Sequence, residues 1–197
     1  MPCLCQQCTV KNCDKKKNLK RRVQGKKNRS TGYYAEKKLL KLFTDWNIPI
    51  SQTVASGRLK NVTNKVKQKY LFSGDFYCDN LIKGKRLKIE NKKRVYSIFK
   101  RYYTLTDNQI CHIENLCYLV NQDTLKQIID SKEIIDKMIS IEDKKFKMLH
   151  TFFEQDNADI VSMISSSEDS NRYMNFIFAI KENVFKRLMK ERGISNE

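Results

Sequence analysis

The sequence contains no apolar run close to the roughly twenty residues that a membrane-spanning helix requires. Its first residues also lack the apolar core of a secretory signal. Acidic residues are scarce, because 22 Asp and Glu stand against 39 Lys and Arg, which gives a net charge of +17. We therefore expect no membrane partner, and a soluble intracellular protein of the cytoplasm or nucleoid, or of a host cytoplasm if it is viral. The charge points to a polyanionic partner.

The seven cysteines do not indicate a disulfide framework, because thiols stay reduced inside cells. Cys3, Cys5, Cys8 and Cys13 follow the pattern C-x-C-x₂-C-x₄-C, and four thiolates this close together are able to hold one tetrahedral Zn²⁺. The alternative is a tail with reactive thiols. Residues 15–29, KKKNLKRRVQGKKNR, then predict a flexible basic arm that contacts phosphates. We treat residues 1–30 as a Cys-rich, basic N-terminal arm.

The positive charge is concentrated in the first half of the chain. Residues 1–30 carry ten Lys and Arg against one acid, and residues 31–104 carry seventeen against five, which are net charges of +9 and +12. Residues 105–159 reverse this balance, with six bases against eleven acids and a net charge of −5. Affinity for phosphate is therefore expected around the acids and strands of residues 31–104.

The order of elements predicts an α/β domain over residues 31–197. Apolar spacing predicts a helix over residues 33–46, and residues 106–140 are expected to be helical, as an insertion over about 95–140. The remaining expectations are a strand at 48–54, a hairpin from 70–78 and 81–92 with its turn at Gly84, a helix at 142–153, strands at 157–164 and 174–180, and a last helix from Lys181 and Glu182 to Gly193.

The predicted hairpin contains the candidate catalytic residues. On its second strand the period of two puts Lys88, Glu90 and Lys92 on one face, with Leu87 and its alternating neighbours on the other. Folding at the Gly84 turn brings Asp75, on the first strand, beside Glu90 and Lys92. Two carboxylates suit Mg²⁺, which takes a few oxygen ligands and leaves other positions to water and phosphate. A neighbouring ammonium is able to orient water.

This arrangement, Gly74-Asp75 followed by Glu90-Asn91-Lys92, resembles the PD-(D/E)XK nuclease superfamily. The resemblance implies a restriction-endonuclease-like mixed central sheet flanked by helices. It also implies that Asp75 and Glu90 bind Mg²⁺, or Mn²⁺ in its place, that the backbone carbonyl of Asn91 adds a ligand, and that Lys92 positions the attacking water. The middle residue of the E-x-K motif is usually apolar in that superfamily, and here it is Asn91.

A narrower resemblance is to Holliday junction resolvases of the archaeal and phage type. It rests on Arg29, the segment 32–36 (GYYAE), the strand at 48–54 and the loop 55–58 (ASGR). In that family the early acid joins the metal site and the Ser-Gly loop approaches the scissile phosphate. The resemblance thus gives those two roles to Glu36 and Ser56. The structural alternative for Glu36 is that an acid in the first turn of a helix stabilises the helix dipole.

These features predict a Mg²⁺-dependent endonuclease that hydrolyses branched DNA and acts as a homodimer, because paired incisions require two sites. Cationic side chains that flank the motifs are the expected DNA contacts: Arg29, Arg58, Lys60, Lys93 and Arg94. The alternatives are a sequence-specific restriction-like or homing endonuclease, and a non-catalytic zinc-containing protein that binds nucleic acid.

Other polar residues are given structural roles. Asp159 is more simply a cap at the start of a strand than a further catalytic acid. Cys111 and His112 are adjacent, so their side chains diverge and do not indicate a metal site with Cys117. His150 is expected to be a surface or packing residue.

Overall fold

The computed structural model describes residues 10–53, 75–93, 105, 108–131, 137–141, 147–155, 157–164 and 176–194. The chain divides into two compact units, Met1–Tyr34 and Ala35–Glu197. Among the helices of the described residues, none is long and apolar enough to cross a membrane.

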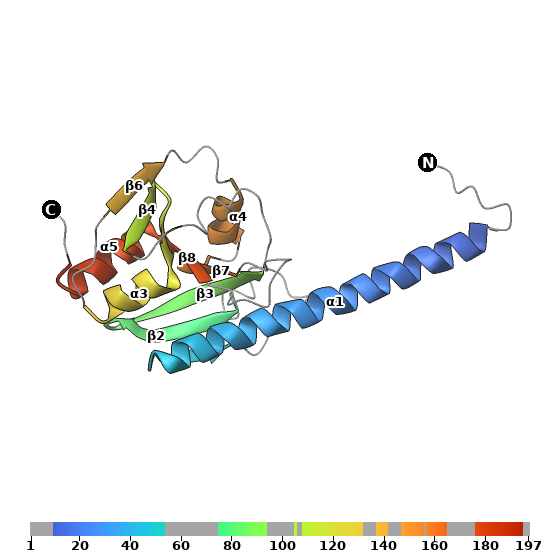
Figure 1. Cartoon of the computed structure of the whole chain (residues 1–197), viewed down its shortest axis with the longest axis horizontal. Helices are drawn as coiled ribbons and strands as arrows, with labels where there is room; N and C mark the ends of the chain where they lie inside the picture. Colours follow the sequence, from blue (N-terminus) through green and yellow to red (C-terminus); the bar gives the residue numbers. More distant parts are fainter. Residues whose placement is uncertain are drawn as a thin grey trace. The chain divides into compact units, whose positions relative to one another are not determined.

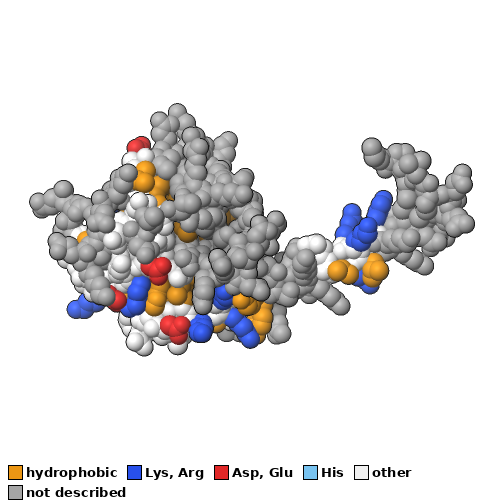
Figure 2. Space-filling view, in the orientation of Figure 1, with side chains coloured by type: hydrophobic (Ala, Val, Ile, Leu, Met, Phe, Trp, Pro, Cys, Tyr) orange, Lys and Arg blue, Asp and Glu red, His pale blue; other side chains and the backbone are white. Residues whose placement is uncertain are grey.

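Helix α1 spans Val10–Asp45 and begins far before the expected start at residue 33. The expectation of a flexible arm over residues 15–29 is therefore wrong, because Lys, Arg, Leu and Gln are good helix formers and no proline interrupts them. In the first unit the side chains of residues 17–24 are exposed, and Lys and Arg crowd these turns beside exposed hydrophobic side chains (Figure 2). Those apolar residues include Leu19 and Val23, which are 63% and 60% exposed.

The second unit is built on one mixed sheet of eight strands, in the order β1-β2-β3-β7-β8-β5-β4-β6 (Figure 1). Only the pairs β3/β7 and β4/β6 are parallel among the described strands. The strands are β1 (Ile50–Gln52), β2 (Phe76–Ile82), β3 (Lys85–Lys93), β4 (Gln109–Ile113), β5 (Cys117–Asn121), β6 (Lys137–Ile141), β7 (Ile160–Ile164) and β8 (Phe176–Lys181).

Helices cover both faces of this sheet. Residues 35–45 of α1, together with α3 (Gln122–Ile129) and α5 (Glu182–Glu191), pack on one face. Helix α4 (Lys147–Gln155) packs on the other face through Leu149, Phe152 and Phe153. The expected α/β class, with a mixed central sheet flanked by helices, is confirmed at this level.

The packed end of α1 follows from its spacing. Ala35, Leu39 and Phe43 recur every four residues and are fully buried, whereas Lys37 and Lys41 between them are exposed. The helix therefore lies on the sheet by one apolar stripe. This packing places the start of the buried segment next to β1. Glu36 therefore lies beside Gln52, to which it is hydrogen-bonded.

The expectation of a helical segment over residues 106–140 is wrong. The structure has the β4–β5 hairpin there, then α3, and then β6. Apolar residues occupy both faces of these strands because both faces of the sheet are covered, so their spacing fits a helix as well as a buried strand. The turn between β4 and β5 holds Asn115 at φ 59°, a left-handed conformation that asparagine adopts more readily than most residues.

The other elements agree with expectation within a few residues. β1 is shorter than residues 48–54 and lies at the edge of the sheet, directly after Pro49. The turn of the β2–β3 hairpin falls at Lys83 and Gly84, where Gly84 has φ +68°. In α5 the predicted inward residues Val184, Phe185, Leu188 and Met189 are buried, and Gly193 follows the helix end at φ +69°.

Candidate active site

Asp75 lies at a bend just before β2 and is fastened to two strands. Its backbone N–H donates to the carbonyl of Ile89 at 3.1 Å, and its own carbonyl accepts from the Thr53 N–H at 3.0 Å. The register Phe76 to Ile89 places Asp75 opposite Glu90 in the hairpin. The side-chain oxygen Oδ2 accepts from the Asn91 N–H at 2.9 Å. The Asp75 carboxylate therefore docks on the backbone amide between Glu90 and Lys92.

Glu36 reaches the same place from α1. Its Oε2 accepts from Gln52 Nε2 of β1 at 2.9 Å. Burial raises the pKa of Glu36, the negative charge of Asp75 raises it further, and the hydrogen bond from Gln52 lowers it. The structure thus brings the carboxylates of Glu36 and Asp75 close enough for their charges to repel.

Glu90 and Lys92 form an ion pair on the face of β3 that α4 covers. The Glu90 side chain is 10% exposed and that of Lys92 is 21% exposed, so the pair is largely shielded from water. The Lys92 ammonium also lies 4.9 Å from the centre of the Phe152 ring. This position holds the ammonium by a cation–π contact as well as by charge.

The Asn91 side chain points to the opposite face of β3, where its amide oxygen has a hydrogen-bond partner. The hydroxyl of Ser162 on β7 donates to Asn91 Oδ1 at 3.0 Å, across the parallel register of Asn91 and Ser162. Leu87 and Ile89 on the same side of the strand are fully buried. A polar middle residue in the E-x-K motif is therefore accommodated by a serine on the neighbouring strand. A ligand role for the Asn91 carbonyl stays a prediction.

The three acids are linked in pairs, Glu36 with Asp75 by charge and Asp75 with Glu90 by strand register. Among the described residues, no group of three or more His, Cys, Asp or Glu is placed to hold a metal ion. Mg²⁺ is often bound by one or two carboxylates and several waters. Glu36 and Asp75, whose charges interact, therefore fit this cation by donor chemistry. We call Glu36, Asp75, Glu90 and Lys92 the acidic site.

No protein-family model, curated protein or solved structure matches the chain. Functional conclusions therefore rest on the geometry of the acidic site and on the motifs and charge distribution of the sequence.

Several predicted residues lie outside the described part of the chain: Cys3, Cys5, Cys8, Ser56, Arg58, Lys60 and Arg94. Cys13 and Arg29 lie in α1 and Lys93 ends β3, but the structure describes only their backbone. The Zn²⁺ site, the phosphate contact of Ser56 and these DNA contacts stay predictions.

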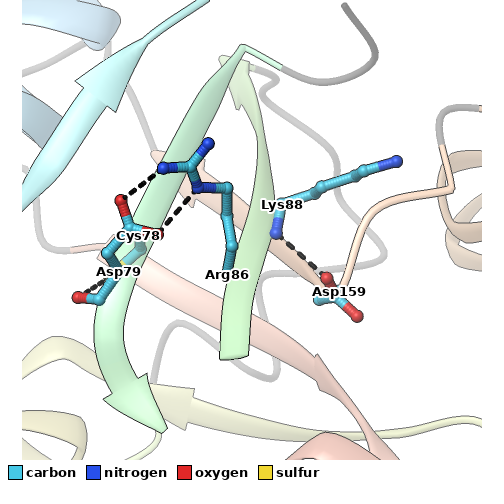
Figure 3. Close-up of polar contacts among 5 residues, drawn as sticks. All are labelled: Cys78, Asp79, Arg86, Lys88 and Asp159. Carbon is cyan, nitrogen blue, oxygen red and sulfur yellow. Dashed lines mark hydrogen bonds and ion pairs between the residues drawn. The ribbon is translucent and has the colours of Figure 1, made fainter. Parts of the chain in front are cut away.

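Asp159 has the capping role that the sequence indicates. Its Oδ2 accepts from the Lys88 N–H at 3.0 Å, and its own N–H donates to the Lys88 carbonyl at 2.9 Å (Figure 3). Asp159 thereby extends the pairing of β7 with β3 by one residue before the strand begins. The same view shows Arg86 of β3 holding Asp79 of β2, with Nε 2.8 Å from Oδ1.

The described cysteines are core residues rather than reactive thiols. Cys78, Cys111 and Cys117 are free and buried. Burial, and secondarily the charge of Asp79, raises the pKa of Cys78 to about 12, and burial raises that of Cys111 to about 11. His112 lies on a strand rather than on the expected helix, where it stacks on Tyr118 with ring centroids 4.3 Å apart.

Sequence inspection did not find Gln52, Phe152 or Ser162. Gln52 belongs to a strand only three residues long, so alternation gives almost no signal there. Phe152 and Ser162 act through α4 and β7, more than fifty residues after the hairpin. The parallel pairing of β3 with β7 places Ser162 beside Asn91, and the packing of α4 places Phe152 beside Lys92.

Proposed function

We propose that this chain is a Mg²⁺-dependent, structure-selective DNA endonuclease that resembles a Holliday junction resolvase. The observation that carries the proposal is the position of Asp75. Its carboxylate is held on the Asn91 amide, its backbone lies opposite Glu90, and its charge raises the pKa of Glu36. Two half-shielded acids that raise each other's energy are a favourable place for a divalent cation.

The order of elements supports the same proposal. A helix, three antiparallel strands, a helix and a strand parallel to the third follow one another as α1, β1, β2, β3, α4 and β7, with β4, β5, α3 and β6 inserted before α4. This order is compatible with the restriction-endonuclease-like fold that the sequence resemblance implies.

The chain's own groups have distinct tasks in this proposal. Glu36 and Asp75 hold the cation, with Glu90 beside them, and a bound cation supplies positive charge to the phosphodiester oxygens. Lys92, fixed by Glu90 and Phe152, orients the water that adds to phosphorus. The bond from phosphorus to O3′ breaks and O3′ takes up a proton. The products are a 3′-hydroxyl and a 5′-phosphate, as the resemblance implies.

The charge distribution favours nucleic acid as the substrate. Residues 31–104, which supply the whole acidic site, carry a net charge of +12. A site of excess negative charge inside a strongly positive region combines cation binding with phosphate affinity. Cutting both strands of a four-way junction requires two such sites, so we propose a two-fold homodimer.

The test is a comparison of Asp75→Asn with Asp79→Asn, two equal charge changes on the same side of the hairpin. The amide oxygen that Asp75→Asn introduces still accepts a hydrogen bond from the Asn91 N–H, but the lost charge weakens cation binding. We expect Mg²⁺-dependent cleavage of a four-way junction to fall by about 100-fold or more in Asp75→Asn and to persist in Asp79→Asn. Binding of the uncut junction should persist in both.

Two outcomes decide against this proposal. Equal cleavage by Asp75→Asn and the natural chain would remove the site assignment. Salt-sensitive binding of DNA without any Mg²⁺-dependent cleavage by the natural chain would favour a non-catalytic binding protein instead. Comparing a four-way junction with linear duplexes of the same sequence separates a structure-selective enzyme from a restriction-like or homing enzyme.

A further inference from the structure

A row of charged residues crosses three neighbouring strands on the face of the sheet that carries Glu90 and Lys92. Lys88 of β3, Asp159 before β7 and Lys181 of β8 lie side by side. The backbone bonds that fix this row run from Asp159 N–H to the Lys88 carbonyl at 2.9 Å and from Lys181 N–H to the Asp159 carbonyl at 3.0 Å. Lys88 precedes Glu90 by two strand residues, so both side chains share one face.

The row has an excess of positive charge. Lys85 joins it, with its ammonium 3.4 Å from Asp159 Oδ1. Burial lowers the pKa of Lys181, the charge of Asp159 raises it, and the charges of Lys85 and Lys88 lower it. The ammonium of Lys181 is thus influenced by two further ammonium groups and by one carboxylate. We call Lys85, Lys88 and Lys181 the lysine cluster.

A pocket of about 470 Å³ opens beside Lys181. Its polar lining comes from Asn115, Lys181, Glu182, Asn183 and Lys186. Glu182 is neutralised there by Lys186, since the two side chains are 2.5 Å apart. The Lys181 ammonium lies 5.8 Å from the centre of the Phe153 ring, at the apolar wall of the pocket. The pocket therefore offers amide and ammonium donors next to the excess charge of the lysine cluster.

Helix α4 joins this place to the acidic site. Phe152 contacts Lys92 and the next residue, Phe153, contacts Lys181. The two lysines therefore lie under one turn of the same helix. Along β3, Lys88 is about 6.6 Å from Glu90, at about 3.3 Å per strand residue. A lysine side chain at that distance is able to reach a phosphate neighbouring one bound at the acidic site.

We propose that the lysine cluster binds a backbone phosphate of the same DNA strand whose scissile phosphate lies at the acidic site. The proposal rests on the proposed function and adds a second contact point that sets the position of the strand. It predicts a role in substrate binding rather than in the chemical step. Loss of the cluster should therefore raise KM and leave kcat nearly unchanged.

The experiment uses Lys88→Gln combined with Lys181→Gln in the full chain. The matched control is Lys126→Gln combined with Lys190→Gln, which removes the same charge from α3 and α5 on the opposite face of the sheet. Binding of a fluorescent four-way junction is measured against salt concentration, with Ca²⁺ in place of Mg²⁺. We expect weaker binding for the cluster variant only, with a slope of log K against log salt that is smaller by about 1 to 2.

Lys88→Arg combined with Lys181→Arg keeps the charge and should restore both the binding affinity and the slope of log K against log salt. This variant therefore distinguishes the loss of a phosphate contact from a loss of folding. Equal effects of the cluster variant and the control would overturn the proposal, as would no effect of either. Because binding is measured without cleavage, the result stands apart from the nuclease test. An Asp75→Asn protein that still cleaves, together with the expected slope change, would refute the nuclease site and keep the phosphate contact.

Discussion

The acidic site and the lysine cluster carry opposite excesses of charge. At the acidic site there are three carboxylates and one ammonium, which pairs with Glu90. At the lysine cluster there are three ammonium groups and one carboxylate, Asp159, which pairs with Lys85. Lys88 and Glu90 lie on the same face of β3, and neighbouring rings of α4 contact Lys92 and Lys181. The comparison shows that strand pairing, rather than local sequence alone, groups these charges. Asp75 lies opposite Glu90, and Asp159 lies beside Lys88.

The largest effect is expected from Lys92→Ala, which removes the ammonium from the acidic site. Cleavage should be abolished, and the free energy of unfolding without Mg²⁺ should fall by about 3 kcal/mol or more, because the Glu90 carboxylate would stay buried without its ion-pair partner. Urea unfolding followed by circular dichroism measures the second effect.

The matched variant combines Lys92→Ala with Glu90→Gln, which removes the buried charge as well. It should regain much of the stability and none of the cleavage. Retained cleavage by Lys92→Ala and by Glu90→Ala would contradict the roles given to both residues. A double variant no more stable than Lys92→Ala would show that the ion pair does not account for the loss.

A smaller effect concerns the pH dependence of stability. The pKa of Glu36 is raised above the ordinary 4.5, so the folded protein binds this proton more tightly than the unfolded chain. Without metal, stability should therefore fall as pH rises from 4.5 through the raised pKa. Glu36→Gln should flatten this fall, and Mg²⁺ should oppose it in the natural chain only. Thermal unfolding from acidic to neutral pH measures it, and identical profiles for the two proteins would refute the raised pKa of Glu36.

The smallest effect is expected at the turn end of the hairpin. Arg86 and Asp79 form a close ion pair, but the Arg86 side chain is 56% exposed, and water and salt screen an exposed pair. Arg86→Gln should therefore leave the free energy of unfolding nearly unchanged and leave cleavage intact. A loss as large as that of Lys92→Ala, measured in the same urea titration, would show that exposure does not distinguish the two pairs.

The spacing of apolar residues in the sequence predicted which face of β3 and which side of α1 are buried. The alternation of Leu87 to Lys92 gave the faces of β3, and the four-residue spacing of Leu39 and Phe43 gave the buried side of α1. The same logic failed over residues 106–140, because strands buried on both faces have no alternation to detect.

The acidic site was predictable as a set of residues but not as a geometry. Asp75, Glu90 and Lys92 came from one hairpin, whose turn at Gly84 is a local signal. The contact of Glu36 with Gln52 and the docking of Asp75 on the Asn91 amide depend on how α1 and β1 pack on that hairpin. Contacts between segments so far apart in the chain produce no periodic pattern in a single sequence.

The place of β3 in the sheet has a consequence for access. β3 is third in the strand order, and neighbouring strands lie about 4.8 Å apart, so it is about 10 Å from the β1 border and about 24 Å from the β6 border. The strands β4, β5 and β6 thus widen the sheet on the remote side. Asp75 and Glu90 therefore lie within two strand spacings of the β1 border of the described sheet.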